Sequence, residues 1–161
     1  MIVLTSSAKL GFAEARNLGI RKAKEEWIFI LDADERATND LRREIEIAIR
    51  NRKYDGYDIP RKNIVLGKWI KGAGWYPAYQ MRLFKKGKGY SSNREVHESI
   101  ILHGEKGKLK SGLIHFCIPT VSTAWKKYDR YTTLEVKDKI KRDETFKAWK
   151  FLIYPFLHFI D

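Results

Sequence analysis

The segment WIFILDADE, residues 27–35, sets a continuous apolar run directly before three acids, Asp32, Asp34 and Glu35. The run at 27–31 has the length of a β-strand and is apolar on both faces, which is typical of a strand in the middle of a covered sheet. It stops abruptly at Asp32. We therefore expect a buried strand whose carboxyl end presents Asp32 and Asp34.

Further elements are predicted around this strand. Apolar residues at helical spacing predict a helix over residues 12–24, and an earlier apolar run at 2–4 suits a short strand. Thr38 is a candidate N-cap for another helix that ends near Asn51. Strand, helix, strand, helix in this order indicates an α/β unit with parallel strands.

The rest of the chain changes in character. Short β-like segments separated by glycines and prolines predict hairpins beside the parallel sheet. Their ranges are 57–60, 63–66, 68–70, 79–84, 95–102 and 109–118. After Pro119, apolar residues at three- and four-residue spacing, with charges on the other side, predict a helix; they are Val121, Trp125, Tyr128, Thr132, Val136 and Ile140. We expect a core over residues 1–118 and a helical C-terminal arm over 119–161.

Length and composition limit the class of protein. The chain has 161 residues, the size of one domain, and 43% of them are apolar, enough for a hydrophobic core. A single cysteine, Cys117, excludes a disulfide scaffold and a cysteine-built zinc site. Residues 1–10 lack the apolar stretch of a signal peptide, and the best apolar run, 151–160, is too short to span a bilayer. We therefore expect a cytoplasmic protein, and the formal net charge of +12 predicts anionic partners.

The acid pair predicts a metal site. If the chain stays extended, a spacing of two directs the Asp32 and Asp34 carboxylates to one side, at the edge of the sheet where α/β proteins bind ligands. Two carboxylates suit Mn²⁺ or Mg²⁺, which would neutralise a phosphorylated ligand. The alternative is a solvated strand end followed by a helix-capping acid.

Two other acid motifs fit less well. A calcium loop needs an oxygen ligand at its fifth position and glycine at its sixth, where this chain has Arg36 and Ala37. Phosphatases with an aspartyl nucleophile usually carry Thr or Val two residues beyond the second acid, where this chain again has Arg36.

Several blocks of sequence accompany the acids: GFAEARN (11–17), WIFILDADE (27–35), Tyr76-Pro77, QMRLF (80–84), Val96-His97-Glu98 and Tyr131-Thr132. Together they resemble the family 2 glycosyltransferases, and more narrowly the branch of lipopolysaccharide-core glucosyltransferase-like enzymes. The resemblance implies an incomplete GT-A fold, a Rossmann-like parallel or mixed sheet with added β-hairpins. The family's first strand, with its uridine-binding segment, has no counterpart before Met1, and the branch usually continues beyond Asp161. We therefore expect an interior piece of a longer enzyme.

The resemblance also implies roles for residues. Asp32 and Asp34 would hold the divalent metal, with Asp32 also touching the nucleotide. Arg16 and Asn17 would line the nucleotide pocket, and Arg82 would grip a phosphate or position the acceptor, unless these side chains are simply solvated. The expected donor is a nucleotide-sugar such as a UDP-sugar, the acceptor is a glycan or a lipid-linked sugar, and transfer inverts the anomeric carbon.

His97 and Glu98 are the candidates for acid–base chemistry. By the resemblance, Glu98 is the general base that takes the acceptor's proton, and His97 contacts the metal or the diphosphate. Their side chains face opposite sides of a regular strand, so both reach one site only at a bulge or a turn. The alternative is a structural histidine beside a surface acid. His103 and His115 are predicted to be structural.

Basic and aromatic residues interleave in the middle of the chain. From Arg61 through Arg94 there are nine Lys and Arg and no acid. Trp75 and Tyr76 would hold the acceptor sugar, or else anchor a loop to the core. The rival hypothesis is a non-enzymatic basic module that binds nucleic acid or anionic lipid. Nucleic acid is disfavoured because no nucleic-acid motif accompanies these residues and the acid pair would repel phosphates.

The segment 145–160 mixes large apolar residues with Lys147 and Lys150, the composition of a segment at an anionic membrane interface. A helix packed on the sheet and a surface for self-association are the alternatives. We therefore expect a cytoplasmic protein that can lie peripherally on the inner face of the cell membrane.

Overall fold

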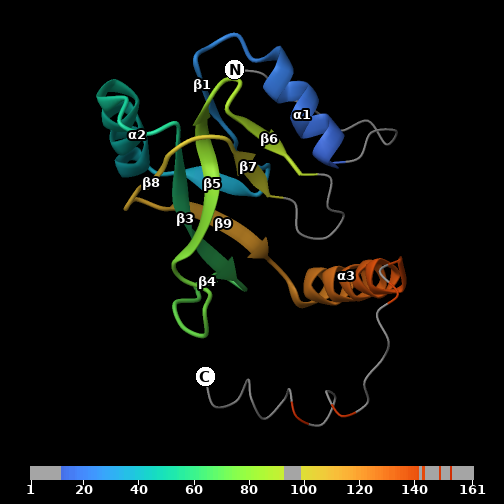
Figure 1. Cartoon of the computed structure of the whole chain (residues 1–161). Coiled ribbons are helices and arrows are strands. Elements are labelled where there is room, and N and C mark those ends of the chain that lie inside the picture. Colours follow the sequence, from blue (N-terminus) through green and yellow to red (C-terminus); the bar gives the residue numbers. More distant parts are fainter. Residues whose placement is uncertain (1–11, 93–98, 142, 144–148, 150–152, 154–161) are drawn as a thin grey trace.

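A seven-stranded mixed sheet forms the centre of the protein in a computed structural model that describes residues 12–92, 99–141, 143, 149 and 153 (Figure 1). Its path runs through β1 (Trp27–Phe29), β5 (Ala78–Lys85), β3 (Gly56–Val65), β9 (Leu113–Ile118) and β2 (Glu35–Ala37), with β4 (Lys68–Trp69) and β8 (Lys106–Lys108) also paired to β3. A separate antiparallel pair consists of β6 (Gly89–Ser91) and β7 (Ile100–Leu102). Since β3 is parallel to β8 and β9 but antiparallel to β4 and β5, the predicted mixed α/β class with added hairpins is confirmed.

Two helices cover opposite faces of the sheet beside β1 (Figure 1). Ile20 of α1 (Phe12–Lys22) packs in a buried cluster with Ile28, whereas Leu41 of α2 (Asn39–Asn51) lies in a second cluster. Trp27 and Phe29, on either side of Ile28 in β1, pack against that second cluster. This alternation explains why the strand is apolar on both faces, because each face has its own helix.

The strand predicted for the middle of the sheet, β1, has one neighbour within the described residues. There β1 pairs with β5 in antiparallel register. A helix on each face accounts for its apolar pattern, with Ile28 buried and Trp27 and Phe29 half-buried. Its central position in the sheet stays a prediction. Parallel pairing occurs at β3 instead. The predicted strand at 2–4 lies outside the described residues.

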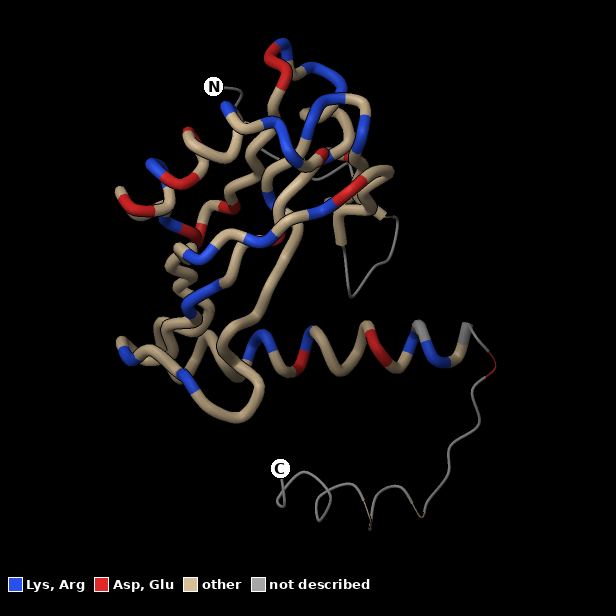
Figure 2. The backbone as a smooth tube through the Cα atoms, turned by 60° about the vertical axis from the view of Figure 1, so that its left-hand side comes forward, with Lys and Arg blue, Asp and Glu red and all other residues tan. Residues whose placement is uncertain are grey.

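The third helix, α3 (Val121–Lys141), begins after Pro119 as predicted and extends away from the sheet (Figures 1 and 2). Near its start, the Lys127 ammonium donates to the Cys117 carbonyl of β9 at 2.6 Å. No helix in the described ranges is both long enough and apolar enough to cross a bilayer. Most of the segment 145–160 lies outside the described residues, and the division at residue 118 stays a prediction.

The N-cap of α2 gives a test of this fold. The Thr38 hydroxyl accepts a hydrogen bond from Leu41 N at 3.1 Å. Thr38→Ala should therefore lower the free energy of unfolding by about 1 kcal/mol, measured by urea denaturation, because an amide of the first turn loses its partner. Thr38→Ser keeps an acceptor and should stay close to wild type. An equal loss in both variants would contradict the cap.

Candidate active site

The acids that follow β1 lie in a turn. Glu35 N donates to Asp32 O at 3.0 Å, and Asp32 N donates back to the Glu35 carboxylate at 3.1 Å. The extended chain that would direct Asp32 and Asp34 to one side is therefore not present here. Their carboxylates instead lie beside different groups: Asp32 is paired with Arg16 and Arg82, whereas Asp34 lies near His115.

Asp32 is held by an arginine on each oxygen. Arg16 of α1 donates to Oδ1 at 3.0 Å, and Arg82 of β5 donates to Oδ2 at 2.8 Å. Burial on its own would raise the pKa of Asp32, but the charges and hydrogen bonds of Arg82 and Arg16 outweigh burial and leave the pKa below its ordinary value. Asp32 is therefore a carboxylate at neutral pH, with 35% of its side chain still exposed.

Glu35 lies beneath this pair and is a functional candidate that the sequence analysis did not select. Its side chain is fully buried, accepts from Arg82 at 2.6 Å and lies 3.7 Å from the Arg61 guanidinium. Arg82 itself is only 4% exposed, so the solvated alternative for this residue is wrong. The signal was available in the sequence, because an arginine inside an apolar strand needs a buried counterion and an acid follows the neighbouring strand.

Asp34 approaches a histidine that had been predicted to be only structural. Asp34 Oδ2 lies 3.3 Å from His115 Nε2, and His115 sits on β9, which pairs with β2. Burial and the nearby Arg61 charge lower the pKa of His115 below its ordinary value, although Asp34 acts in the opposite direction. The imidazole is therefore neutral near pH 7.

The hydrogen bonds of Asn63 determine which ring nitrogen of His115 carries the proton. The Asn63 amide nitrogen donates to the Trp75 carbonyl at 3.2 Å, so its oxygen must face His115 Nδ1, at 2.8 Å. A carbonyl oxygen accepts only, which places the proton on Nδ1 and leaves a lone pair on Nε2. That lone pair and the Asp34 carboxylate face each other, an arrangement suited to a shared cation.

The remaining predicted residues are dispersed. Asn17 does not reach the acids: its side chain binds the Ser91 backbone, donating at 2.9 Å and accepting at 2.8 Å, and so fastens α1 to β6. Trp75 is 38% exposed in the loop before β5, and Tyr76 packs edge-on against Trp69 with 5.1 Å between ring centroids. His97 and Glu98 lie outside the described residues.

The donor set can be compared with the needs of a metal ion. No group of three or more His, Cys, Asp or Glu within the described part of the chain is arranged around a common point. Mn²⁺ and Mg²⁺ nevertheless require few protein ligands, because water and substrate phosphates complete their coordination. Asp34, 45% exposed, and His115 Nε2 supply an oxygen and a nitrogen donor, with Asp32 two residues away. In chemical type, these residues fit such a cation.

Comparisons with known proteins give the family of the chain and one relative. The family described as Glycosyl transferase family 2 matches residues 1–132. Over 153 residues the chain is 25% identical to a protein of Rhizobium meliloti (strain 1021) named lipopolysaccharide core biosynthesis glycosyltransferase LpsC. That alignment covers 93% of this chain and 57% of LpsC, so the chain spans somewhat more than half the length of this relative.

The ion pairs of Asp32 predict a pH-dependent contribution to stability. Because the folded-state pKa lies below the ordinary 3.8, the contribution is present above that pH and is lost as the pH falls through the lowered pKa. Asp32→Asn should therefore destabilise the protein near pH 7, and the difference from wild type should shrink toward zero in strong acid. Urea denaturation across this range measures it, with Asp129→Asn on exposed α3 as the control. A difference that is constant with pH would contradict the ion pairs.

Proposed function

The chain belongs to glycosyl transferase family 2, and from this we propose that it transfers a sugar from a nucleotide-sugar to a glycan or lipid-linked acceptor, with inversion and with a divalent metal. A UDP-sugar is the proposed donor. Because LpsC is named for lipopolysaccharide core biosynthesis, the proposed acceptor is a glycan of the cell envelope. The activity of a whole enzyme of LpsC length is part of this proposal.

The pairing of Asp34 with His115 is the observation that supports the proposal most. The carboxylate and the Nε2 lone pair lie 3.3 Å apart beside Asp32, whose charge is already balanced by Arg16 and Arg82. Asp34 and His115 would hold the metal, which when bound would stabilise the negative charge of the departing diphosphate. Asp32 would orient the nucleotide through its half-exposed carboxylate. Arg16, with 22% of its side chain exposed, adds a positive charge beside Asp32.

Inversion requires a base on the opposite side of the sugar from the diphosphate. The acceptor oxygen forms its bond to the anomeric carbon while the bond from that carbon to the diphosphate oxygen breaks, and the acceptor's proton passes to a carboxylate. Glu98 is the proposed base and His97 a proposed contact to the diphosphate, both by family resemblance. Trp75 is the proposed sugar platform, because its ring is partly exposed while its carbonyl binds Asn63, the partner of His115.

The alternative, a nucleic-acid module, is weakened by how the basic residues are used. Arg61 and Arg82 face the buried Glu35, and Lys85 pairs with Asp55 at 3.1 Å. Lys62 and Lys71 lie over the Trp69 ring, at 5.1 and 4.6 Å from its centroid. Several cations in the stretch 61–94 are therefore already engaged by acids or by an aromatic ring of the protein itself.

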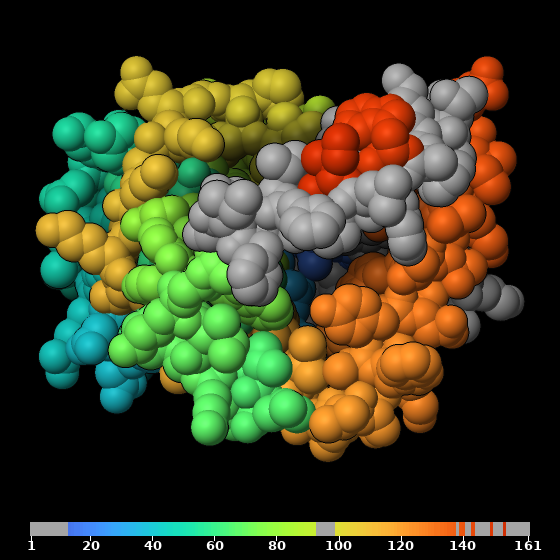
Figure 3. Space-filling model, turned by 90° about the horizontal axis from the view of Figure 1, so that it is seen from below, coloured from blue at the N-terminus to red at the C-terminus, as the bar shows by residue number. Residues whose placement is uncertain are grey.

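An exposed apolar stripe on α3 supports peripheral binding to an anionic membrane. Val121, Trp125 and Tyr128 are 71%, 78% and 69% exposed, with Lys126 and Arg130 on another side of the helix. The β3–β4 turn adds Leu66, 53% exposed, whose amide binds Ile118 just before α3. In Figure 3 the segment around Leu66 and the start of α3 lie on the same face of the molecule. A cationic protein with such a face suits anionic lipid.

The metal proposal predicts linked binding of Mn²⁺ and UDP. Mn²⁺ binding, followed by electron paramagnetic resonance with and without UDP, should be strengthened by UDP. Asp34→Asn and His115→Gln should each weaken Mn²⁺ binding about tenfold or more, because each removes one ligand. Coupling of the bound Mn²⁺ to an imidazole nitrogen should disappear in His115→Gln.

His103→Gln is the matched control, since His103 stacks on Tyr90 at 5.6 Å between ring centroids and belongs to no proposed ligand set. Mn²⁺ binding that survives in Asp34→Asn, or UDP binding that ignores Mn²⁺, would overturn the metal-dependent proposal.

The membrane proposal predicts binding to vesicles that contain phosphatidylglycerol and little binding to neutral phosphatidylcholine vesicles. Trp125→Glu should weaken cosedimentation with the anionic vesicles about tenfold, because it replaces a large apolar contact with a charge. Ile47→Glu, at a 59% exposed position on α2, is the control and should bind like wild type. Equal losses in both variants would contradict the role of α3.

A further inference from the structure

The proposed chemistry leaves one buried carboxylate without a role. Glu35 is only 1% exposed, although an isolated buried charge is among the costliest groups in a protein. Within the described part of the chain its partners belong to the site: the amide of Asp32, the guanidinium of Arg82 and, more distantly, that of Arg61. Loss of the Glu35 charge would therefore act directly on Asp32 and on the guanidiniums beside it.

Arg82 divides its charge between two acids. A single nitrogen, Nη2, donates to Asp32 Oδ2 at 2.8 Å and to Glu35 Oε1 at 2.6 Å. Glu35, with the shorter bond and the deeper position, therefore shares the single Arg82 charge with Asp32. Without Glu35, Arg82 would neutralise Asp32 alone, and Arg61 would lack its nearest carboxylate.

Among the residues that the structure describes, the formal charges of this cluster balance. They are three carboxylates and three guanidiniums, namely Asp32, Asp34, Glu35, Arg16, Arg61 and Arg82. A balanced cluster admits a divalent cation, whereas an excess positive charge in a poorly solvated site repels it. The single acid whose loss leaves both exposed aspartates in place is Glu35.

We propose that Glu35 is a positioning residue, a buried counterion of Arg82 and Arg61 that keeps the Asp32–Asp34 turn able to bind a divalent cation. The inference rests on the proposed metal-dependent function and assigns to Glu35 no contact with substrate or metal. Glu35 acts through two connections, since one carboxylate oxygen holds Asp32 N and the other holds Arg82.

Charge-altering variants test this directly in the full chain, with Mn²⁺ alone as the probe and its affinity measured by electron paramagnetic resonance. Glu35→Gln keeps the size of the side chain but leaves one excess positive charge, so its Mn²⁺ affinity should fall about tenfold or more. The double variant Glu35→Gln with Arg82→Gln restores the balance and should recover most of that affinity. Arg61→Gln leaves one excess negative charge and should bind Mn²⁺ several-fold more tightly.

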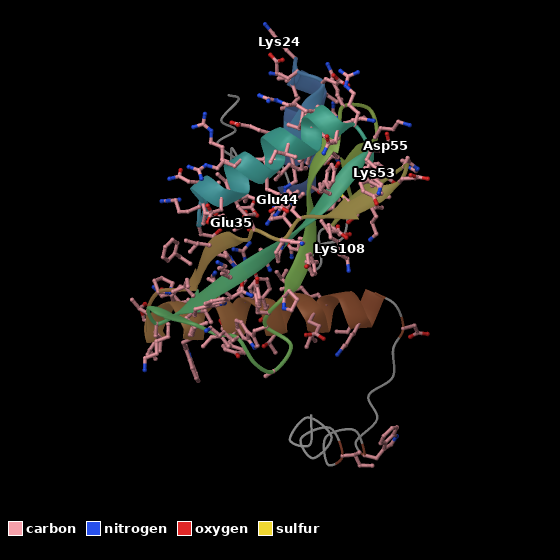
Figure 4. All side chains as sticks on the ribbon, turned by 90° about the vertical axis from the view of Figure 1, so that its left-hand side faces the viewer. Lys24, Glu35, Glu44, Lys53, Asp55 and Lys108 are labelled. Carbon is pink, nitrogen blue, oxygen red and sulfur yellow. The ribbon has the colours of Figure 1, made fainter. Side chains whose placement is uncertain are left out.

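The control is Glu44→Gln. Glu44 lies on α2 and accepts from the backbone amides of Lys110 and Ser111 at 2.8 and 2.7 Å, and Figure 4 labels it together with Glu35. It has the same chemistry but no guanidinium partner in the cluster, so its Mn²⁺ affinity should not change. Thermal melting of every variant verifies folding, and if Glu35→Gln does not fold, the partly exposed Arg61→Gln decides the question.

The relative Mn²⁺ affinities of the variants distinguish an electrostatic role of Glu35 from a purely structural one. A purely structural Glu35 would make the double variant bind Mn²⁺ no better than Glu35→Gln, and would leave Arg61→Gln at the wild-type value; either result overturns the inference. If Asp34→Asn abolishes Mn²⁺ binding while Glu35→Gln preserves it, the proposed function stands and only the role of Glu35 fails. If wild type binds no Mn²⁺, both fail.

Discussion

One guanidinium determines the shape of the site. Arg82 projects from the middle of β5, is almost wholly buried, and holds Asp32 and Glu35 through a single nitrogen. Those two acids begin and end the turn between β1 and β2, so Arg82 fastens a turn that leaves the sheet at β1 and rejoins it beside β9. Charged groups are buried only when they are paired and hydrogen-bonded, and here the pairing also decides which oxygens remain exposed. The carboxylates that remain partly exposed are those of Asp32 and Asp34.

The sequence predicts the elements well because their signals are local. The apolar run at 27–31, the Thr38 cap and the helical spacing after Pro119 each depend on near neighbours, and each element is present. The order of strands is not local: a strand covered by a helix on each face has the same apolar pattern at the end of a sheet as in its middle, so the pattern of β1 does not fix its neighbours. The candidate site divides in the same way. Asp32, Asp34, Arg16 and Arg82 could be selected from sequence blocks, whereas the roles of Glu35 and His115 depend on contacts across the sheet.

Net charge is a poor guide to the surface of this protein. The sequence carries +12, which by itself favours a nucleic-acid or lipid partner. In the folded protein Arg61 and Arg82 point inward and pair with Glu35. Lys62 and Lys71 lie over the Trp69 ring. Part of the positive charge is therefore engaged within the protein. On α1, two adjacent polar residues likewise bind different parts of the protein. Arg16 reaches Asp32, while Asn17 clamps the Ser91 backbone and thereby keeps Arg16 in place.

The loop that carries Trp75 and Tyr76 is connected by hydrogen bonds to the turn at Asp32–Glu35, although the two are more than thirty residues apart in sequence. The Trp75 carbonyl orients the Asn63 amide, the amide oxygen places the proton on His115 Nδ1, and the free Nε2 faces Asp34. Each link depends on the one before it, because an amide that turned over would present its NH₂ group to Nδ1 and move the ring proton to Nε2. If a sugar bound to Trp75 displaced the loop and turned the Asn63 amide over, the ring proton of His115 would therefore move to Nε2. The lone pair that faces Asp34 would then be lost. In the proposed function, the metal side and the acceptor side would both depend on a single amide orientation, which the backbone at Trp75 sets.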